Sequence, residues 1–425
     1  MKIKVLDAMM GSGKTTKLIQ DIADLPADSK VIYITPLLTE CHRIAGTVFD
    51  PEDEKKQPIV AYQGNDGIDE YVYDTEHALI SRRFRHPSYA GGSKMDNLLF
   101  QVQHGCNVVS THALFRAMTP KVAAAIKDSG YILVLDEVLS VYEEFTDLKR
   151  EELDKLLENG ILSVAADKIT LVFNKERFGD TEHTRYQEIA DLCEMRQLMV
   201  VDGKVVFWEF PIDTLNVFNE VWIATYLFGG SQMCAYLKSH NVEFELERFG
   251  RKPSEIKHLV KIVDDQKLNT IGDKDTALSK QQVVVNKTPV EQLRKNLNNF
   301  FRAKNKTKIE ERLWTTYKAA SGNISAGRFA KSWLACTTKA TNDWKDTSHV
   351  AYLINLFVHP MIVKLLAAKG SQMDLNLYAL SEMVQFIWRS RIREGKEIQL
   401  YIPSKRMRNL LIRWLNDEFE VKHAN

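Results

Sequence analysis

The chain has no long hydrophobic run and no excess of charge of one sign. Although 44% of its 425 residues are hydrophobic, no apolar segment approaches the roughly 20 residues that a membrane-spanning helix needs. Its 57 Lys and Arg residues nearly balance its 56 Asp and Glu residues, for a formal net charge of +1. We therefore expect no membrane partner, and any nucleic acid would have to bind through local basic patches.

Cysteine is scarce, and its spacing excludes two further classes of protein. The five cysteines are scattered, and no two have the spacing of a disulfide framework or a zinc site. They are Cys41, Cys106, Cys193, Cys234 and Cys336. No signal peptide precedes the first predicted strand, at residues 3–6. These features predict a cytoplasmic protein with reduced thiols; they are compatible with a monomer but leave the oligomeric state open.

The most informative segment present is residues 8–16, with the sequence AMMGSGKTT. It lies between the predicted strand at residues 3–6 and a predicted helix at residues 17–23. A strand, a glycine-rich turn, Lys-Thr and a helix make the loop that surrounds phosphate with backbone amides. Lys14 can reach the β- and γ-phosphates of ATP, and the Thr15 hydroxyl can bind Mg²⁺. The predicted nucleotide-binding residues are Gly11, Ser12, Gly13, Lys14, Thr15 and Thr16.

Two carboxylates form the second motif. Residues 132–135 are four apolar residues that predict a central strand, and Asp136 and Glu137 follow at its carboxyl end, where open α/β sheets bind ligands. We expect Asp136 to hold Mg²⁺, directly or through water. Glu137 is expected to orient and polarise the water that attacks the γ-phosphate.

A basic segment near the end of the chain is the third motif. Gln385 is followed by Arg389, Arg391 and Arg393, of which Arg389 and Arg393 share one helical face and Arg391 points elsewhere. The segment is either a solvated basic helix end or the source of an arginine finger that a second domain delivers to the γ-phosphate. The residues alone leave both interpretations open.

Strands and helices alternate along the chain, which predicts an α/β fold with parallel sheets. A second alternating block begins near residue 255, so we predict two domains, at 1–250 and 251–425. Insertions are expected in the first domain, near 50–105 and 143–220. Within these blocks the pattern predicts a strand at 170–173, a hairpin at Asp202 and Gly203, a strand at 282–285 and a helix at 376–393.

Together these motifs resemble the superfamily 2 helicases, especially phage DExD/H-box proteins and herpesvirus origin-binding helicases. Residues 8–16 resemble motif I, Asp136 and Glu137 motif II, and residues 385–393 motif VI. Weaker similarities link residues 35–40 to motif Ia, 110–112 to motif Ib, 224–225 to motif III, 284–287 to motif IV and 337–342 to motif V. The resemblance implies two RecA-like domains in tandem with an ATP cleft between them.

The resemblance also implies which residues lie toward a nucleic acid strand. Backbone amides and hydroxyls at such positions contact phosphate without reading sequence. The implied residues are Thr35, Pro36, Leu37, Thr111, His112, Thr337 and Thr338. The chain departs from the family where Trp388 replaces the motif VI glycine, where motif II ends in Val-Leu, and where only seven residues precede motif I, too few for an adenine-reading Gln motif.

The predicted function is an ATP-dependent DNA helicase or translocase that acts on single-stranded or forked DNA. By analogy with the family, it would serve phage replication or recombination in the host bacterial cytoplasm. Three alternatives stay open: an RNA-directed superfamily 2 ATPase, a motor that moves on duplex without separating strands, and an NTPase or small-molecule kinase that does not act on nucleic acid.

Overall fold

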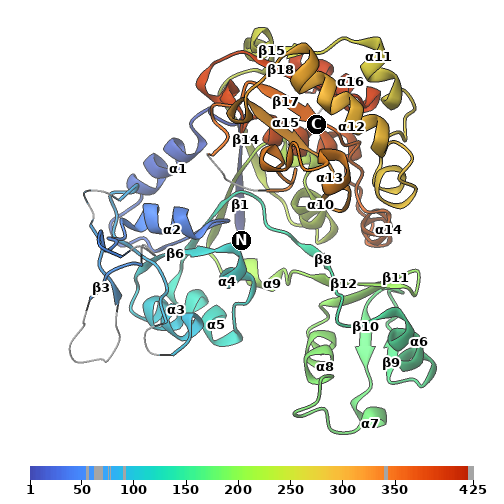
Figure 1. Ribbon diagram of the computed structural model, residues 1–425. Helices are drawn as coiled ribbons and strands as arrows, with labels where there is room; N and C mark the ends of the chain where they lie inside the picture. The colour runs from blue at the N-terminus through green and yellow to red at the C-terminus, as the bar shows by residue number, and fades with distance from the viewer. Residues whose placement is uncertain are drawn as a thin grey trace.

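A computed structural model describes residues 1–53, 57–61, 70–74, 76, 78–89, 92–338 and 343–419. Each half of the chain forms its own sheet of parallel strands, and the C-terminal half lies above the N-terminal half in the view of Figure 1. The strands of the larger sheet come from the first 248 residues and those of the smaller from residues 260–401. This confirms the predicted fold class, α/β with parallel sheets in tandem. The domain division at residue 250 stays a prediction, although none of the strand pairings among the described residues crosses it.

The larger sheet has seven parallel strands in the order β14-β1-β13-β7-β2-β6-β5. Its strands are β1 (Lys2–Asp7), β2 (Val31–Thr35), β5 (Phe84–Arg85), β6 (Asn107–Thr111), β7 (Ile132–Asp136), β13 (Glu220–Thr225) and β14 (Glu245–Arg248). The helices around it are α1 (Lys14–Ala23), α2 (Leu38–Ala45), α3 (Lys94–Gln103), α4 (His112–Arg116), α5 (Pro120–Ser129), α9 (Asp213–Asn216) and α10 (Gln232–Ser239). A short antiparallel pair, β3 (Val60–Ala61) and β4 (Glu70–Tyr71), lies in the predicted first insertion.

The central strands are apolar because helices cover both faces of the sheet. All five residues of β2 are buried, as are Leu133, Val134 and Leu135 of β7. In the pairing register, Asp7 lies beside Thr225, and Ala224 lies beside Asp136. The carboxyl ends of β1, β13 and β7 therefore meet at one edge of the sheet.

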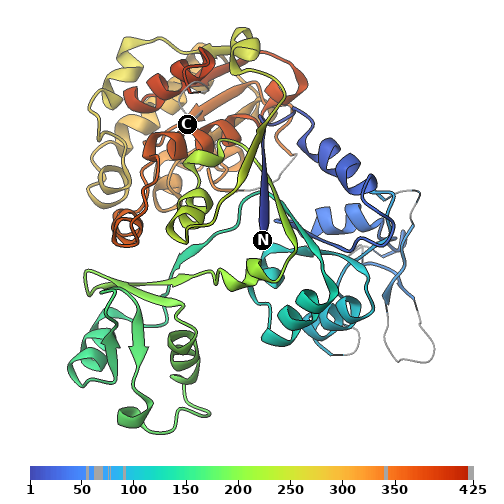
Figure 2. The ribbon, with the colours of Figure 1, turned by 180° about the vertical axis from the view of Figure 1, so that it is seen from behind.

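The second predicted insertion is a separate lobe, which we call the insert lobe (residues 142–209). It comprises β8 (Tyr142–Glu144), α6 (Arg150–Glu158), β9 (Leu162–Val164), β10 (Leu171–Phe173), α7 (Lys175–Phe178), α8 (Gln187–Glu194), β11 (Leu198–Val201) and β12 (Val205–Glu209). The predicted strand is β10, and the predicted hairpin joins β11 to β12. In two opposite views the lobe extends away from the body on the side opposite α1 and α2 (Figures 1 and 2).

The smaller sheet has four parallel strands in the order β15-β18-β17-β16. These are β15 (Val260–Ile262), β16 (Arg312–Thr315), β17 (His349–Tyr352) and β18 (Ile398–Tyr401). The helices of this half are α11 (Gln266–Asn269), α12 (Val290–Asn298), α13 (Lys318–Ser325), α14 (Pro360–Ala368), α15 (Leu375–Ile387) and α16 (Lys405–Leu415).

One predicted element in this half is wrong, and another ends earlier than predicted. The predicted strand at 282–285 is part of a π-helix, Gln281–Val285, in which Val283 is buried but Val285 is 61% exposed, so the apolar run has no sheet to join. The predicted helix at 376–393 ends at Ile387. Ser390 has extended backbone, and its hydroxyl donates to the Ile387 carbonyl, an alternative to continued helix that serine side chains offer.

The two halves pack closely at the loop that follows β1, which we call the glycine loop (residues 8–13). Met9 lies in one hydrophobic cluster with Trp388 and other residues of the C-terminal half. A Cβ atom on Gly11 would lie 3.1 Å from Cζ2 of Trp388. On the same loop, the Ser12 hydroxyl accepts a hydrogen bond of 3.2 Å from the Arg251 amide, at the connection between the halves.

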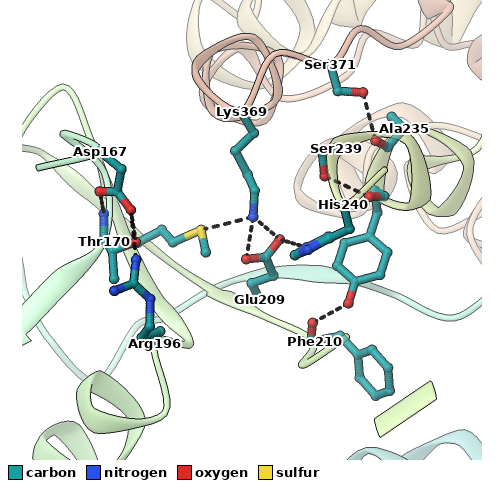
Figure 3. A network of polar contacts seen from close by, with 12 residues as sticks. Asp167, Thr170, Arg196, Glu209, Phe210, Ala235, Ser239, His240, Lys369 and Ser371 are labelled. Carbon is teal, nitrogen blue, oxygen red and sulfur yellow. Dashed lines mark hydrogen bonds and ion pairs between the residues drawn. The ribbon is translucent and has the colours of Figure 1, made fainter. Parts of the chain in front are cut away.

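Helix α14 makes a second connection, because it belongs to the C-terminal half but packs into the core of the first. Its residues Ile362, Leu365 and Leu366 lie in the cluster that fills one face of the seven-stranded sheet. Just beyond the helix, Lys369 forms a buried ion pair with Glu209 at the root of the insert lobe, with Nζ 2.6 Å from Oε2 (Figure 3). The Nε2 atom of His240 lies 3.1 Å from Oε1 of the same carboxylate.

This buried pair leads to a first prediction. Lys369→Met leaves the Glu209 carboxylate buried without its cation, which should lower the free energy of unfolding by about 3–5 kcal/mol. Lys364→Met is the matched control, because Lys364 lies on α14 but pairs with Asp202 at the surface, a contact worth about 0–1 kcal/mol. Urea unfolding measures both. Adding Glu209→Leu to Lys369→Met should recover most of the loss, and equal losses for the two lysine variants would contradict the prediction.

The glycine loop leads to a second prediction. Gly11 and Gly13 have φ of 73° and 84°. Of these two glycines, Gly13 alone has open space where a Cβ atom would lie. Gly13→Ala should therefore cost only the left-handed strain of about 1–2 kcal/mol. Gly11→Ala should cost more, because Trp388 must also move. In urea unfolding, Trp388→Leu should abolish the difference between the two alanine variants; a difference that survives this substitution refutes the packing argument.

Candidate functional site

An open cleft of about 730 Å³ lies between the two halves, beside the glycine loop. The N-terminal half contributes the loop, the start of α1, and the carboxyl ends of β2 and β7. The C-terminal half contributes Gln385, Trp388, Arg389 and Arg393 from α15 and the residues after it. The structure therefore places the three strongest sequence motifs in one cleft.

The glycine loop has the backbone shape that its two glycines allow. Gly13, in the left-handed region, is the residue before α1, and Lys14 begins the helix. The Lys14 ammonium group turns back to donate a hydrogen bond of 2.6 Å to the Ala8 carbonyl. Of the six residues predicted to bind nucleotide, Gly11, Gly13, Lys14, Thr15 and Thr16 line the cleft. Ser12 instead holds the Arg251 amide.

Lys14 faces several carboxylates. Burial lowers the pKa of its ammonium group, and the charges of Glu137, Asp136 and Asp7 act in the opposite direction. Lys14 lies at the N-terminus of a helix, where an anionic ligand can bind. A divalent cation bound to that ligand would balance the charge of the three nearby acids.

Asp136 is the most perturbed carboxylate of the cleft. Burial, helped by the charge of Glu137, raises its pKa to about 6, while a hydrogen bond from Tyr33 and the charge of Lys14 lower it. The Tyr33 hydroxyl donates to Oδ2 at 3.0 Å. Asp136 is thus poised to change protonation near neutral pH, as groups at functional sites often do.

Glu137 is held in a strained backbone conformation. Its φ is 88°, rare for a residue with a side chain. Its amide donates to the Ala224 carbonyl at 2.9 Å, and its Oε1 atom accepts a hydrogen bond of 2.5 Å from the Thr225 hydroxyl. The end of β13 therefore fixes both the backbone and the side chain of Glu137.

The structure separates the three arginines that the sequence grouped together. Arg389 is only 8% exposed, and its Nη1 atom has no hydrogen-bond partner among the described residues. Arg393 lines the cleft and is exposed. Arg391 does not line the cleft, and its Nε donates to the Glu397 carbonyl at 2.6 Å. Gln385 lines the cleft and donates to the Ser381 hydroxyl at 3.3 Å.

The residues implied to lie toward nucleic acid occupy two places. Thr35 and Thr111 are paired at the carboxyl ends of β2 and β6; Thr35 and Pro36 line the cleft. Leu37 precedes α2, and the Thr111 hydroxyl caps α4, which begins at His112. Thr337 and Thr338 lie in the C-terminal half and do not line this cleft; residues 339–342 of the same motif lie outside the described residues.

Sequence reasoning missed Arg43, which lines the cleft, and Tyr33, which donates a hydrogen bond to Asp136. Tyr33 lies two residues before Thr35 on β2, so strand periodicity places both on one face. Arg43 follows Glu40 by three residues on α2, donates to its carboxylate, and brings a further positive charge to the cleft from the N-terminal half. One-turn spacing from Glu40 was the signal that could have found it.

The residues present fit a divalent cation only in company with a ligand. No group of three or more His, Cys, Asp or Glu side chains that could hold a metal occurs in the part of the chain that the structure describes. Thr15 and Asp136 do line one cleft. A hydroxyl and a carboxylate suit Mg²⁺, which usually keeps several waters and shares phosphate oxygens.

Among the described helices, none has the length and apolar character needed to cross a bilayer. Among solved structures, the DUF1998 helicase MrfA aligns with a TM-score of 0.35 and 8% identity, over 97% of this chain and 48% of that one. The chain thus spans about half the length of that helicase, and similarity this low assigns no activity.

Two comparisons of sequence are more specific. Residues 254–415 match a family model described as the YonV C-terminal Rossmann-like domain. The SPbeta prophage-derived uncharacterized protein YonV of Bacillus subtilis (strain 168) is 30% identical over 442 residues, which cover 98% of this chain and 99% of that protein. Because the similarity extends over nearly the whole of both proteins, the chain belongs to the YonV family.

Proposed function

We propose that the protein is a nucleic-acid-dependent ATPase, and specifically a DNA helicase or translocase of the superfamily 2 type. One observation carries the proposal: the buried guanidinium of Arg389, whose Nη1 atom has no hydrogen-bond partner among the described residues, lines the same cleft as Lys14 and Asp136 but comes from the other half of the chain. A site assembled from two halves is what a nucleotide-driven change in their relative position requires.

The residues of the cleft suit Mg²⁺-ATP. The glycine-loop amides, Lys14 and Thr16 would hold the phosphates, while Thr15 and Asp136 would hold Mg²⁺. Bound Mg²⁺ supplies neutralisation of charge on the phosphate oxygens. Glu137, oriented by Thr225, is placed to accept a proton from water, and Arg389 is placed to stabilise negative charge. We assign this role to Arg389 and not to Arg391, because Arg391 does not line the cleft.

The distribution of charge supports nucleic acid binding by the two halves and not by the insert lobe. Sixteen of the chain's 56 acidic residues lie between residues 142 and 209, against nine of its 57 Lys and Arg residues. The insert lobe is therefore acidic, and the rest of the chain has a net charge of about +8. The two nearly cancel in the net charge of +1 for the whole chain. An acidic lobe is a poor candidate to hold a phosphate backbone.

Not every basic cluster is free to bind phosphate. Arg82 donates to the Ile22 carbonyl of α1 and to carbonyls that follow this helix, Arg312 donates to Thr307, and Arg406 donates to Asn355 and Leu356. These arginines stabilise the fold. The exposed cations Lys287, Arg302 and Lys306 remain the better candidates in the C-terminal half.

Prophage origin is stated for the YonV relative, and it supports a role for this protein in phage DNA metabolism in a bacterial cytoplasm. The motifs do not distinguish DNA from RNA, so RNA is the alternative activator. An NTPase or kinase without a nucleic acid partner is the competing proposal from another class.

The third prediction tests the function. Steady-state ATP hydrolysis should rise several-fold with single-stranded DNA, and Lys14→Ala should abolish it. Arg389→Ala should lower kcat by about 10³-fold or more, as loss of an arginine finger does, whereas Arg391→Ala should retain most of it. Parallel assays with duplex DNA and RNA identify the preferred activator. Turnover that no nucleic acid changes would refute the motor and favour the competing NTPase.

The fourth prediction concerns pH. Because Asp136 must be ionised to hold a cation and its pKa is about 6, kcat/KM should fall as the pH drops through about 6. Tyr33→Phe removes a hydrogen bond that lowers this pKa, so the acid limb should move to higher pH. Tyr236→Phe is the matched control, since its buried hydroxyl donates to the Phe210 carbonyl, remote from these motifs. Equal profiles for wild type and Tyr33→Phe would contradict the assignment.

A further inference from the structure

Tyr226 directly follows the residue that holds Glu137, and it is bound by two helices of the other half. Its side chain is 9% exposed and lies in the hydrophobic cluster of the C-terminal half, although its backbone continues from β13 of the N-terminal sheet. It is neither part of the cleft lining nor one of the residues implicated by the motifs.

Two hydrogen bonds join Tyr226 to the C-terminal half. Its hydroxyl accepts a bond of 2.7 Å from Nε1 of Trp414 on α16. Its carbonyl accepts a bond of 3.2 Å from the Ser381 hydroxyl on α15. The same Ser381 hydroxyl accepts from Gln385, which lines the cleft one helical turn later. Both the side chain and the backbone of Tyr226 therefore follow the position of the C-terminal half.

On the other side, the neighbours of Tyr226 hold the acids of the N-terminal half. Thr225 donates to Glu137 at 2.5 Å. The amides of Leu227 and Phe228 donate to the buried Asp7 carboxylate, at 2.7 and 3.3 Å, at the start of the glycine loop. Leu227 has a φ of 55°, which allows the sharp turn that aims both amides at Asp7.

We propose that Tyr226 is a positioning residue that couples the position of the C-terminal half to the orientation of Glu137. This inference rests on the proposed function. A shift of α15 and α16 moves Tyr226 through its two bonds, and the adjoining peptide is rigid, so the Thr225 hydroxyl moves with it. Since Glu137 is already strained, a small displacement of Thr225 changes how its carboxylate faces the cleft.

The proposed coupling predicts how much stimulation of kcat each substitution removes. A single buried hydrogen bond contributes about 1 kcal/mol, which corresponds to about a fivefold effect on a rate. If the Tyr226–Trp414 bond transmits the nucleic acid signal, removing either partner should reduce stimulation of kcat by about fivefold. Removing both should reduce it no further, because the same bond is lost in each case.

The experiment compares Tyr226→Phe, Trp414→Phe and the double variant for kcat and KM with and without single-stranded DNA. We expect the KM for ATP to stay unchanged, stimulation to fall about fivefold in each single variant, and the double variant to match the singles. Ser381→Ala provides a second, independent break in the same connection and should also reduce stimulation. Tyr131→Phe is the matched control, because its buried hydroxyl donates only within the N-terminal half, and it should leave stimulation unchanged.

The outcomes separate this inference from the proposed function. A wild-type protein without stimulated turnover overturns both. Stimulated wild type with unchanged variants overturns the coupling role alone. Effects of the two single substitutions that multiply in the double variant also overturn it, because they act through separate interactions. Loss of thermal stability in Tyr226→Phe with full stimulation would assign Tyr226 a structural role only.

Discussion

The parallel pairing of β1, β13 and β7 is the constraint on which the rest of the site depends. Parallel strands end at one edge, and the register places Asp7 beside Thr225, and Ala224 beside Asp136. Glu137 directly follows the end of β7, and Lys14 follows the end of β1 after the glycine loop. A slip of one residue in either pairing would turn Asp7 or Asp136 to the opposite face of the sheet. The backbone hydrogen bonds between these strands therefore position the charged side chains of the cleft. The side chains themselves take no part in those bonds.

The second half of the molecule is joined to this edge by more than the connecting segment. Trp388 packs on Gly11, α14 packs into the core of the N-terminal half, and Tyr226 reaches back into the C-terminal half. Any motion of one half relative to the other must therefore break or rearrange these contacts. Trp388 stands where the motif that residues 385–393 resemble has glycine, and its ring packs against Gly11 of the glycine loop.

Charge is distributed so that the two halves and the insert lobe differ in sign. The buried ion pair of Lys369 and Glu209 joins the insert lobe to the C-terminal half (Figure 3). The lobe as a whole carries more acidic than basic residues. Its acidic surface disfavours contact with a phosphate backbone, while the basic remainder favours it. The charge count therefore argues against the insert lobe as a phosphate-binding element.

The sequence by itself determined the α/β class, the glycine loop, the carboxylates after β7 and the hairpin of the insert lobe. Each depends on local chemistry: apolar strands, glycines that permit positive φ, and turn residues at Asp202 and Gly203. It failed at residues 282–285, where an apolar run lacked a neighbouring strand, and beyond Ile387, where Ser390 ends the helix. Only the tertiary structure decided which arginines line the cleft, that Arg43 lines it too, that Tyr33 binds Asp136, and that Tyr226 joins the two halves. Those facts depend on how segments more than a hundred residues apart pack together, and no local pattern encodes that packing.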